Sequence, residues 1–416
     1  MAMGRKWIGL FCIMLLVLAG SGCFRLNVQE NREKKVITGL EKVLRNPEDF
    51  QGKRVGLIAN PTSITQDYQH ALDAMLARGI QVTKVFGPEH GVRGAEQAGE
   101  EPETVVDPKT GIPFENLYGK KPEEMASLFQ EVDVLVFDMQ ETGTRFYTYL
   151  YTMADAMKAA GMLKKPLYVL DRPNPLGGTR VEGPLLNPAF RSSVGRFPIP
   201  LVHGMTMGEL ALLINDQQSP KAELHVVNME GWTRDQRYED TGLPWVMPSP
   251  NMPSPLTALV YPGTGLVEGT NLSEGRGTTR PFELVGAPYV NGWELSQALN
   301  RARLPGVVFR EAYFIPTFSK FQGEEVGGVQ IHVTDVDQFD PVLTGITILE
   351  KTKKLYPEQF AWVRSGEKYW IDLQAGTDQI RRQLDQGKSA REITRQWKKE
   401  INHFKGIRKK YLLYSS

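Results

Sequence analysis

Nearly continuous apolar runs alternate with amphipathic stretches through the first half of the chain. The runs at 54–59, 132–137 and 166–170 predict strands that are buried on both faces. The stretches 65–78 and 146–160 carry apolar residues at helical spacing, and a glycine that would end a helix follows each of them. This alternation predicts an α/β fold with a doubly wound parallel sheet.

The composition changes near residue 250. Five prolines between residues 245 and 262 disfavour regular structure, so we place a domain boundary between 254 and 255. A chain of 416 residues is too long for one typical core, which agrees with two domains, 36–254 and 255–416. Further strands are expected at 80–86 and 223–228 and a helix at 207–215. A smaller α+β domain is expected after the boundary, with helices at 293–301, 347–355 and 389–405 and a strand at 329–333.

The first segment of the chain has the layout of an export signal. Arg5 and Lys6 precede an apolar stretch at 7–19 that is too short for an ordinary spanning helix. It ends in Leu-Ala-Gly-Ser-Gly-Cys at 18–23, which resembles a bacterial lipobox. The resemblance implies a lipoprotein signal peptide over 1–22, lipid attachment to Cys23 and a polar tether over 23–35.

This interpretation predicts an extracytoplasmic protein anchored to the cell membrane through Cys23. A plain secretory signal or an uncleaved anchor, with a chance cysteine, is the alternative. The other cysteine, Cys12, lies inside the signal. The mature chain would therefore have no thiol for a disulfide, a nucleophile or a metal site.

Composition and charge exclude several classes of function. The chain is 41% hydrophobic and 23% charged, as globular proteins are, and its net charge is +1. Without a basic stripe we expect no binding of nucleic acid. The sequence has no spacing of metal ligands, no nucleotide-binding fingerprint and no Gly-x-Ser-x-Gly elbow. We therefore expect no metal, no cofactor and no α/β-hydrolase.

Two crowded polar clusters follow predicted strands, one after 80–86 and one after 132–137. Their candidate members are Glu89, His90 and Arg93 in the first cluster and Asp138, Glu141 and Arg145 in the second. Because ligands of open α/β sheets bind outside the carboxyl ends of the strands, we expect these clusters to converge on one crevice. A carboxylate beside an imidazole can move protons there.

Structural roles compete with these functional ones. An ion pair between Glu89 and Arg93 would explain the first cluster equally well. Asp138 and Thr142 lie where a helix N-cap is expected, and capping explains Asp138 as well as catalysis does. A lone histidine such as His203 is more often structural than functional.

Other polar groups are expected near the same crevice. Arg145 and Tyr147, just after the second strand, suit a sugar or an acidic ligand. Arg172 and His203 each follow an extended run and would reach the same edge of the sheet. The segment 268–280 is dense in Gly, Ser, Thr and charge. Its candidate residues are Glu268, Asn271 and Arg276.

Six longer motifs occur along the chain. They are Gly-Pro-Glu-His-Gly-Val-Arg-Gly at 87–94, Phe-Asp-Met-Gln-Glu-Thr-Gly-Thr-Arg-Phe-Tyr-Thr-Tyr at 137–149, Val-Leu-Asp-Arg-Pro-Asn-Pro-Leu-Gly-Gly at 169–178, His-Gly-Met-Thr-Met-Gly-Glu-Leu at 203–210, Pro-Ser-Pro-Asn-Met-Pro at 248–253 and Glu-Gly-Thr-Asn-Leu-Ser-Glu-Gly-Arg-Gly-Thr at 268–278. Together they resemble, over roughly 36–416, the bacterial exo-β-N-acetylmuramidases of the NamZ type.

The resemblance implies a Rossmann-like N-terminal domain, a smaller C-terminal domain and an active cleft between them. The implied reaction is hydrolysis of a terminal N-acetylmuramic acid from the non-reducing end of peptidoglycan fragments. Glu89 is then the first catalytic candidate, and Glu141 and Asp138 compete for the second place. Carboxyls about 5–5.5 Å apart would indicate a covalent intermediate, and about 6.5–9.5 Å would indicate activation of water.

The substrate suggests roles for the remaining candidates. The lactyl carboxylate of muramic acid needs a cationic partner, which Arg172, Arg145 or Arg276 would supply. Hydroxyl or acetamido groups would bind Asn251, Asn271 and His203, and the predicted substrate site also includes His90, Arg93, Tyr147 and Glu268. The alternative function is a surface lipoprotein that binds muropeptides without cleaving them, because its crevice would look the same.

Overall fold

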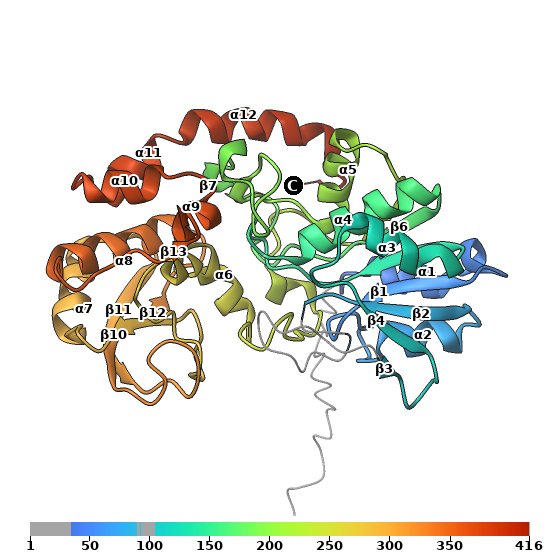
Figure 1. Ribbon diagram of the computed structural model, residues 1–416, viewed down its shortest axis with the longest axis horizontal. Coiled ribbons are helices and arrows are strands. Elements are labelled where there is room, and N and C mark those ends of the chain that lie inside the picture. Colours follow the sequence, from blue (N-terminus) through green and yellow to red (C-terminus); the bar gives the residue numbers. More distant parts are fainter. Residues whose placement is uncertain (1–34, 90–91, 93–104, 416) are drawn as a thin grey trace, which may run out of the picture. The chain divides into compact units, whose positions relative to one another are not determined.

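The computed structural model describes residues 35–89, 92 and 105–415, and within these residues seven strands form one sheet (Figure 1). The strands are β1 (Val55–Ala59), β2 (Val82–Gly87), β3 (Val105–Val106), β4 (Pro113–Asn116), β5 (Val134–Asp138), β6 (Pro166–Leu170) and β9 (Glu223–Val227). Their order is β3-β4-β2-β1-β5-β6-β9, and the pairings are parallel except for β3 with β4. From β4 to β9 this is the strand order of a Rossmann fold, which reverses between β1 and β5.

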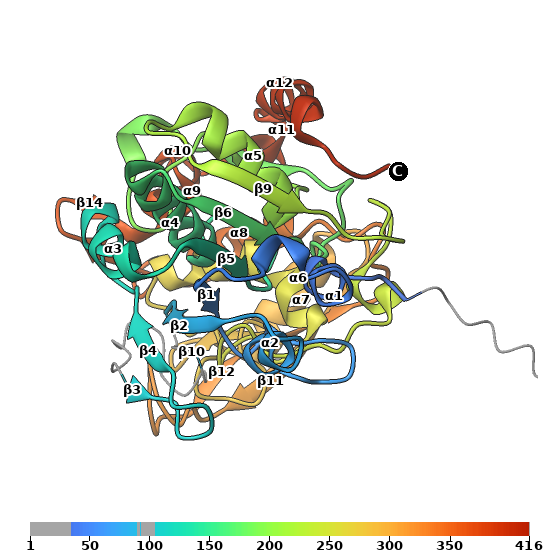
Figure 2. The ribbon, with the colours of Figure 1, turned by 90° about the vertical axis from the view of Figure 1, so that its right-hand side faces the viewer.

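Helices cover both faces of this sheet. On one face lie α1 (Gly39–Arg45) and α2 (Ala71–Ala77), and on the other lie α3 (Pro122–Leu128), α4 (Tyr149–Leu163) and α5 (Met207–Gln217) (Figure 2). The residues of β5 alternate between the two layers. Val134 and Val136 pack with the first layer, and Leu135 and Phe137 with the second. Because both faces are buried, the strands read as apolar runs, and the predicted doubly wound sheet is confirmed.

A smaller α+β domain, as predicted, follows in the second half of the chain. Its antiparallel sheet has the order β10-β12-β11, formed by β10 (Leu284–Ala287), β11 (Val307–Phe314) and β12 (Val326–Val333). Its first helices are α6 (Pro255–Thr264), α7 (Gly292–Arg301) and α8 (Pro341–Leu355). The later elements are β13 (Arg364–Ser365), β14 (Lys368–Tyr369), α9 (Trp370–Ala375), α10 (Gln379–Asp385), α11 (Ala390–Arg395) and α12 (Lys398–Arg408). The boundary between residues 254 and 255 stays a prediction.

Two helix ends differ from the expected ones because of backbone contacts. Helix α4 continues through Gly161 to Leu163, and Lys164 ends it with a left-handed φ of 51°. A Cβ on Gly161 would lie 2.7 Å from the carbonyl oxygen of Lys221, so this glycine serves close packing and does not end the helix. Helix α2 begins at Ala71, later than predicted, because His70 caps it by accepting a bond from the Leu72 N–H.

The proline-rich segment also contains a helix. Pro255 occupies the first turn of α6, where its missing N–H costs no helical bond, and Ser254 caps that turn. The helix expected at 389–405 is divided into α11 and α12 at Gln396 and Trp397. A short antiparallel pair, β7 (Glu182–Leu185) with β8 (Pro200–Val202), lies outside both larger sheets.

The last residues of the chain pack against the first domain. The Arg408 guanidinium donates to the carbonyls of Gly178, His203 and Gly204. The Tyr414 hydroxyl donates to Asp171 and accepts from the Met229 N–H. These contacts join the end of α12 and the residues after it to the edge of the seven-stranded sheet.

Some of the residues named in the sequence predictions are not described by the structure. His90 and Arg93 lie outside the described residues, as do Cys23, the signal segment and nearly all of the tether. Across 35–89, 92 and 105–415, no helix combines the length and the apolar character that crossing a membrane would need.

Candidate active site

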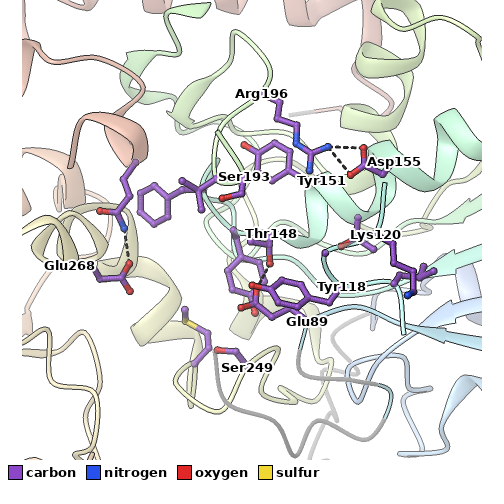
Figure 3. Close-up of a pocket in the computed structure, with 18 of the residues that line it drawn as sticks. Glu89, Tyr118, Lys120, Thr148, Tyr151, Asp155, Ser193, Arg196, Ser249 and Glu268 are labelled. Atoms are coloured by element: carbon purple, nitrogen blue, oxygen red, sulfur yellow. Dashed lines mark hydrogen bonds and ion pairs between the residues drawn. The ribbon is translucent and has the colours of Figure 1, made fainter. Parts of the chain in front are cut away.

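A pocket of about 770 Å³ opens beyond the carboxyl ends of β2 and β4 (Figure 3). Glu89 reaches it from the end of β2, and the loop 117–122 reaches it from the end of β4. One face of α4 forms another part of the wall. The second half of the chain contributes Tyr261, Glu268, Arg276, Phe282, Trp370 and Gln374. The pocket is therefore built from side chains of both halves.

Glu89 is the carboxyl that the sheet delivers to this pocket. It follows β2 after Pro88, and the residue is 9% exposed. The Thr148 hydroxyl, at the start of α4, donates to Oε2 of Glu89 at 2.7 Å. A carboxyl held in place by a neutral hydroxyl is suited to giving or taking a proton.

One face of α4 carries polar pocket residues that sequence reasoning missed. Thr148, Tyr151, Thr152 and Asp155 all line the pocket. Their spacing of three, four and seven residues is that of one helix face, and this periodicity is the signal that would have found them. Arg196 donates from Nη1 to both oxygens of Asp155 at 2.6 Å, and its guanidinium lies 5.2 Å from the Tyr151 ring centre.

A second carboxylate stands in another part of the wall. Glu268 belongs to the short 3-10 helix Gly265–Gly269. It accepts from Nη2 of Arg276 at 2.7 Å and from Nε2 of Gln374 at 2.6 Å. Arg276 also lies 3.3 Å from Glu274. Burial lowers the pKa of Arg276, but the two carboxylates outweigh burial and the net shift is upward.

Aromatic rings form the surface between these polar groups. The Tyr261 ring centre lies 5.0 Å from that of Phe146 and 4.6 Å from that of Phe282. Burial raises the pKa of Tyr147 and of Tyr261 well above the usual value, so both hydroxyls stay protonated near neutral pH. The Tyr147 hydroxyl lies near Tyr149 and Ser249 but completes no hydrogen bond within the described part of the chain.

Asp138 and Arg172 fill the crevice expected at the strand switch point. Both are buried, and Arg172 donates from Nε and Nη2 to the two oxygens of Asp138 at 2.6 and 2.8 Å. Asp138 ends β5, next to β1, where the strand order reverses. The pair does not belong to the pocket lining. The protein's own ion pair therefore occupies the place where other α/β folds bind a ligand.

Glu141 and His203 lie together in the core, outside the pocket lining. Oε2 of Glu141 accepts from the Gly143 N–H and lies 3.8 Å from Nε2 of His203. Burial raises the pKa of Glu141 to about 8 and lowers the pKa of His203 to about 3. Both side chains are therefore predominantly neutral near pH 7.

Arg145, Asn271 and Asn251 also lie away from the lining. Arg145 is buried and donates to the carbonyls of Pro184, Ile199 and Gln374. Burial lowers its pKa to about 10. The Asn271 amide donates to the Gln359 carbonyl and accepts from the Tyr289 hydroxyl. Asn251 is buried and interacts with other residues of the protein.

The structure thus brings four of the described candidates into one pocket. They are Glu89, Tyr147, Glu268 and Arg276. Among the described residues, no group of three or more His, Cys, Asp or Glu side chains is arranged to hold a metal ion. The arrangement offers carboxyls, neutral tyrosine hydroxyls and aromatic faces, which suit the hydroxyl groups and the ring of a sugar.

Comparison with known proteins agrees with this chemistry. The model of "Exo-beta-N-acetylmuramidase NamZ, N-terminal" matches residues 55–256, and that of the C-terminal part matches 259–414. The chain is 48% identical over 388 residues to the peptidoglycan β-N-acetylmuramidase NamZ of Bacillus subtilis strain 168, with 93% of each chain covered.

Two solved structures are also similar. Both are DUF1343 family proteins from Bacteroides fragilis NCTC 9343. One has a TM-score of 0.83 and 36% identity, the other a TM-score of 0.72 and 31% identity, and each comparison covers 92% of this chain and 99% of the other. The prediction of the family is confirmed: this chain belongs to the NamZ family of exo-β-N-acetylmuramidases, which are glycosidases.

Proposed function

We propose that the protein is an exo-acting glycoside hydrolase that releases terminal N-acetylmuramic acid from the non-reducing end of peptidoglycan fragments. We place its active site in the pocket that both halves of the chain line. The observation that carries this proposal is the position of Glu89, a carboxyl bound to Thr148 in that pocket. Two findings support N-acetylmuramic acid as the sugar that is released. The chain belongs to the NamZ family, and its relative from Bacillus subtilis is named as a peptidoglycan β-N-acetylmuramidase.

In the proposed reaction, Glu89 is the general acid. Its proton passes to the glycosidic oxygen as the bond from that oxygen to C1 of the terminal sugar breaks. A water molecule then supplies the new hydroxyl on C1, and the proton that this water loses restores the protonated form of Glu89. The Thr148 hydroxyl keeps the carboxyl oriented toward the pocket. The aromatic surface around Tyr261 faces the sugar ring, and the neutral hydroxyls of Tyr147 and Tyr261 supply donors for its polar groups.

The structure replaces the sequence-based candidates for the second catalytic carboxyl. Asp138 is bound by Arg172, and Glu141 lies in the core outside the lining. Among the described residues, Asp155 and Glu268 are the other carboxylates that line the pocket. Azide added to Asp155→Ala would replace a missing nucleophile or base, so azide-stimulated turnover would assign that role to Asp155. No stimulation would leave the role to the acetamido group of the substrate, because Glu268 stands well apart from Glu89 (Figure 3).

Turnover tests the function directly. Purified protein should release free N-acetylmuramic acid from a p-nitrophenyl β-N-acetylmuramide and from muropeptides. Glu89→Gln should lower kcat/KM by ~10²–10⁴-fold, the contribution of a positioned general acid. Glu123→Gln, which changes an exposed carboxylate outside the pocket lining, is the matched control and should keep wild-type rates.

The leaving group separates an acid role from a structural one. If Glu89 donates the proton, Glu89→Gln should slow a sugar leaving group far more than p-nitrophenol, which leaves readily without a proton. Equal losses on both substrates would remove Glu89 from that role. Saturable binding of muropeptides by the wild type without any released sugar would instead support the non-catalytic binding protein.

We also propose that the mature protein is attached to the membrane by lipid on Cys23. The lipobox-like residues 18–23 support this proposal. Labelled fatty acid should be incorporated into the wild type in a bacterial host, and Cys23→Ala should lose both the label and membrane association. Persistence of the label in Cys23→Ala would contradict lipidation at this cysteine.

A further inference from the structure

A rigid pair of hydrogen-bond acceptors stands in the pocket wall formed by the second half of the chain. Both Glu268 oxygens are held, one by Arg276 and one by Gln374. Gln374 is only 2% exposed, and its Oε1 has no hydrogen-bond partner within the described residues. Figure 3 shows Glu268 and Glu89 well apart in the pocket.

The chemistry of these groups suits a ligand that supplies hydrogen-bond donors. A carboxylate in an ion pair only accepts hydrogen bonds, and each of its oxygens can accept more than one. The Gln374 amide must turn its nitrogen toward Glu268, because its oxygen would meet a second acceptor there. Its oxygen is then a buried acceptor without a donor, which is rare in folded proteins. A neutral ligand with two neighbouring hydroxyls fits both acceptors.

The pocket that contains both carboxylates also has an aromatic surface. Tyr261 lines the same pocket: burial raises the pKa of its hydroxyl, and the nearby charges of Glu268 and Glu89 raise it further. Its ring packs against Phe146 and Phe282, which also line the pocket. A pyranose lying on this aromatic surface with C1 at Glu89 would direct its opposite edge, which carries O4, toward Glu268.

We propose that Glu268 and Gln374 form the subsite that accepts hydrogen bonds from the O4 and O6 hydroxyls of the terminal sugar, and that this subsite imposes the exo mode of attack. The inference rests on the proposed function of the pocket. A sugar inside a glycan strand has no proton on O4, and its neighbour would have to occupy the space of Glu268 and Gln374. Arg276 is a positioning residue here, because Glu268 and Glu274 already neutralise it.

The test pairs variants with substrate analogues. A chromogenic N-acetylmuramide, its 4-deoxy analogue and its 4-O-methyl analogue are assayed with wild type and with Glu268→Ala. The wild type should prefer the parent over the 4-deoxy compound by ~10–100-fold in kcat/KM, the value of a hydrogen bond to a charged group. In Glu268→Ala this preference should shrink to within ~3-fold, because the partner of the hydroxyl is gone.

The comparison does not depend on how much of a variant folds, because both substrates meet the same sample. Glu274→Gln is the matched control: Glu274 is buried, contacts Arg276 and lies outside the lining, so the preference should persist. An unchanged preference in Glu268→Ala would overturn the proposal. Loss of the preference in Glu274→Gln as well would also overturn it, since the effect would then act through Arg276.

Failure of the proposed function would be visible separately. If the wild type turns over none of the three compounds, binding is measured instead. Calorimetry then compares the affinities of N-acetylmuramic acid and its 4-deoxy form for wild type and for Glu268→Ala. Weaker binding of the 4-deoxy form to the wild type, and equal binding of both to Glu268→Ala, would support the subsite. Equal binding of both sugars to the wild type would refute it. The double variant Glu268→Ala with Gln374→Ala should gain activity on the 4-O-methyl compound relative to the parent.

Discussion

Carboxylates at the ends of two strands of the sheet, β5 and β2, have different uses in this protein, and their surroundings decide which. Asp138 ends β5, and Arg172 follows the adjacent strand β6, so the sheet brings the pair together and buries it. Glu89 follows β2 and meets the hydroxyl of Thr148. The first arrangement satisfies every carboxylate oxygen with an arginine, whereas the second leaves a carboxyl facing a pocket.

Glu141 gives a prediction on the pH dependence of stability. Burial raises its pKa from 4.5 to about 8, so the native state binds this proton more tightly than the unfolded chain does. Its contribution to stability is full below about pH 4.5 and is lost as the pH rises through about 8. Glu141→Gln, which stays neutral, should therefore gain free energy of unfolding relative to wild type between pH 6.5 and 8.5.

Urea denaturation across this range measures the effect. The neighbouring His203 still loses a proton in the unfolded chain near its ordinary pKa of 6.5, but wild type and variant both contain it, so its contribution cancels in the comparison. The exposed Glu123→Gln should follow the wild-type curve. Parallel curves for wild type and Glu141→Gln would show that Glu141 does not titrate in this window.

Sequence reasoning located Glu89 but not its surroundings, for a physical reason. A strand followed by Gly-Pro-Glu is a local pattern, and the chain direction alone places that residue at the edge of the sheet. The pairing of Asp138 with Arg172 depends on which strands are adjacent, which local patterns do not reveal. Asp155 was not predicted because its helix has the pattern of an ordinary amphipathic segment. Only the helical spacing of Thr148, Tyr151, Thr152 and Asp155 shows that they share one face.

At the scale of elements, α6 and α8 cross with their backbones in contact. A Cβ on Gly345 would lie 2.2 Å from the Gly263 carbonyl oxygen, and one on Gly263 would meet the Pro341 carbonyl. The absence of both side chains is what allows this crossing. The contact connects the start of the second half of the chain to its longest helix.

Gly345→Ala should therefore destabilise the protein by ~1–3 kcal/mol, because an added methyl group forces two backbones apart. Gly406→Ala is the matched control: a Cβ there meets nothing within 4 Å, and alanine should stabilise α12 by ~0.5–1 kcal/mol. Chemical denaturation of the two variants should show a lower free energy of unfolding for Gly345→Ala and a higher one for Gly406→Ala. Equal stability of Gly345→Ala and wild type would mean that the two helices separate freely.

Helix boundaries were predictable only where local rules decide them. Pro166–Leu170 was predicted as a strand with the bounds that the structure has. Gly161 was expected to end a helix but lies inside α4, because its place is set by the backbone of Lys221, sixty residues further along the chain. The five prolines between 245 and 262 disfavour regular structure, yet Pro255 starts α6, since the first turn requires no N–H from it.

At the scale of the whole molecule, the end of the chain secures the first domain. The Tyr414 hydroxyl bonds Asp171, which also accepts from Thr206 and from the Gly208 N–H at the start of α5. The Arg234 N–H donates to the Ser415 carbonyl. Nothing in the periodicity of the sequence announces these contacts, because single hydrogen bonds over such a separation leave no pattern.

Tyr414→Phe should lower the free energy of unfolding by ~1–3 kcal/mol, because it leaves the Met229 N–H and one bond of Asp171 unsatisfied. Tyr411→Phe removes a similar hydroxyl that bonds the exposed Asp216, and it should change stability by less than ~0.5 kcal/mol. Thermal unfolding compares the pair. Equal melting temperatures for both variants would show that the chain end contributes nothing through Tyr414.

The polar face of α4 has a consequence for how this family diversifies. Thr148, Thr152 and Asp155 meet the pocket, while Met153, Ala156 and Met157 of the same helix are buried in the core. Under the proposed function, substitutions of the first three residues would change which ligand the pocket accepts. Substitutions of the buried three would change the stability of the fold. A few substitutions in the first set would therefore change the cell-wall sugar that the proposed enzyme prefers and leave the scaffold intact.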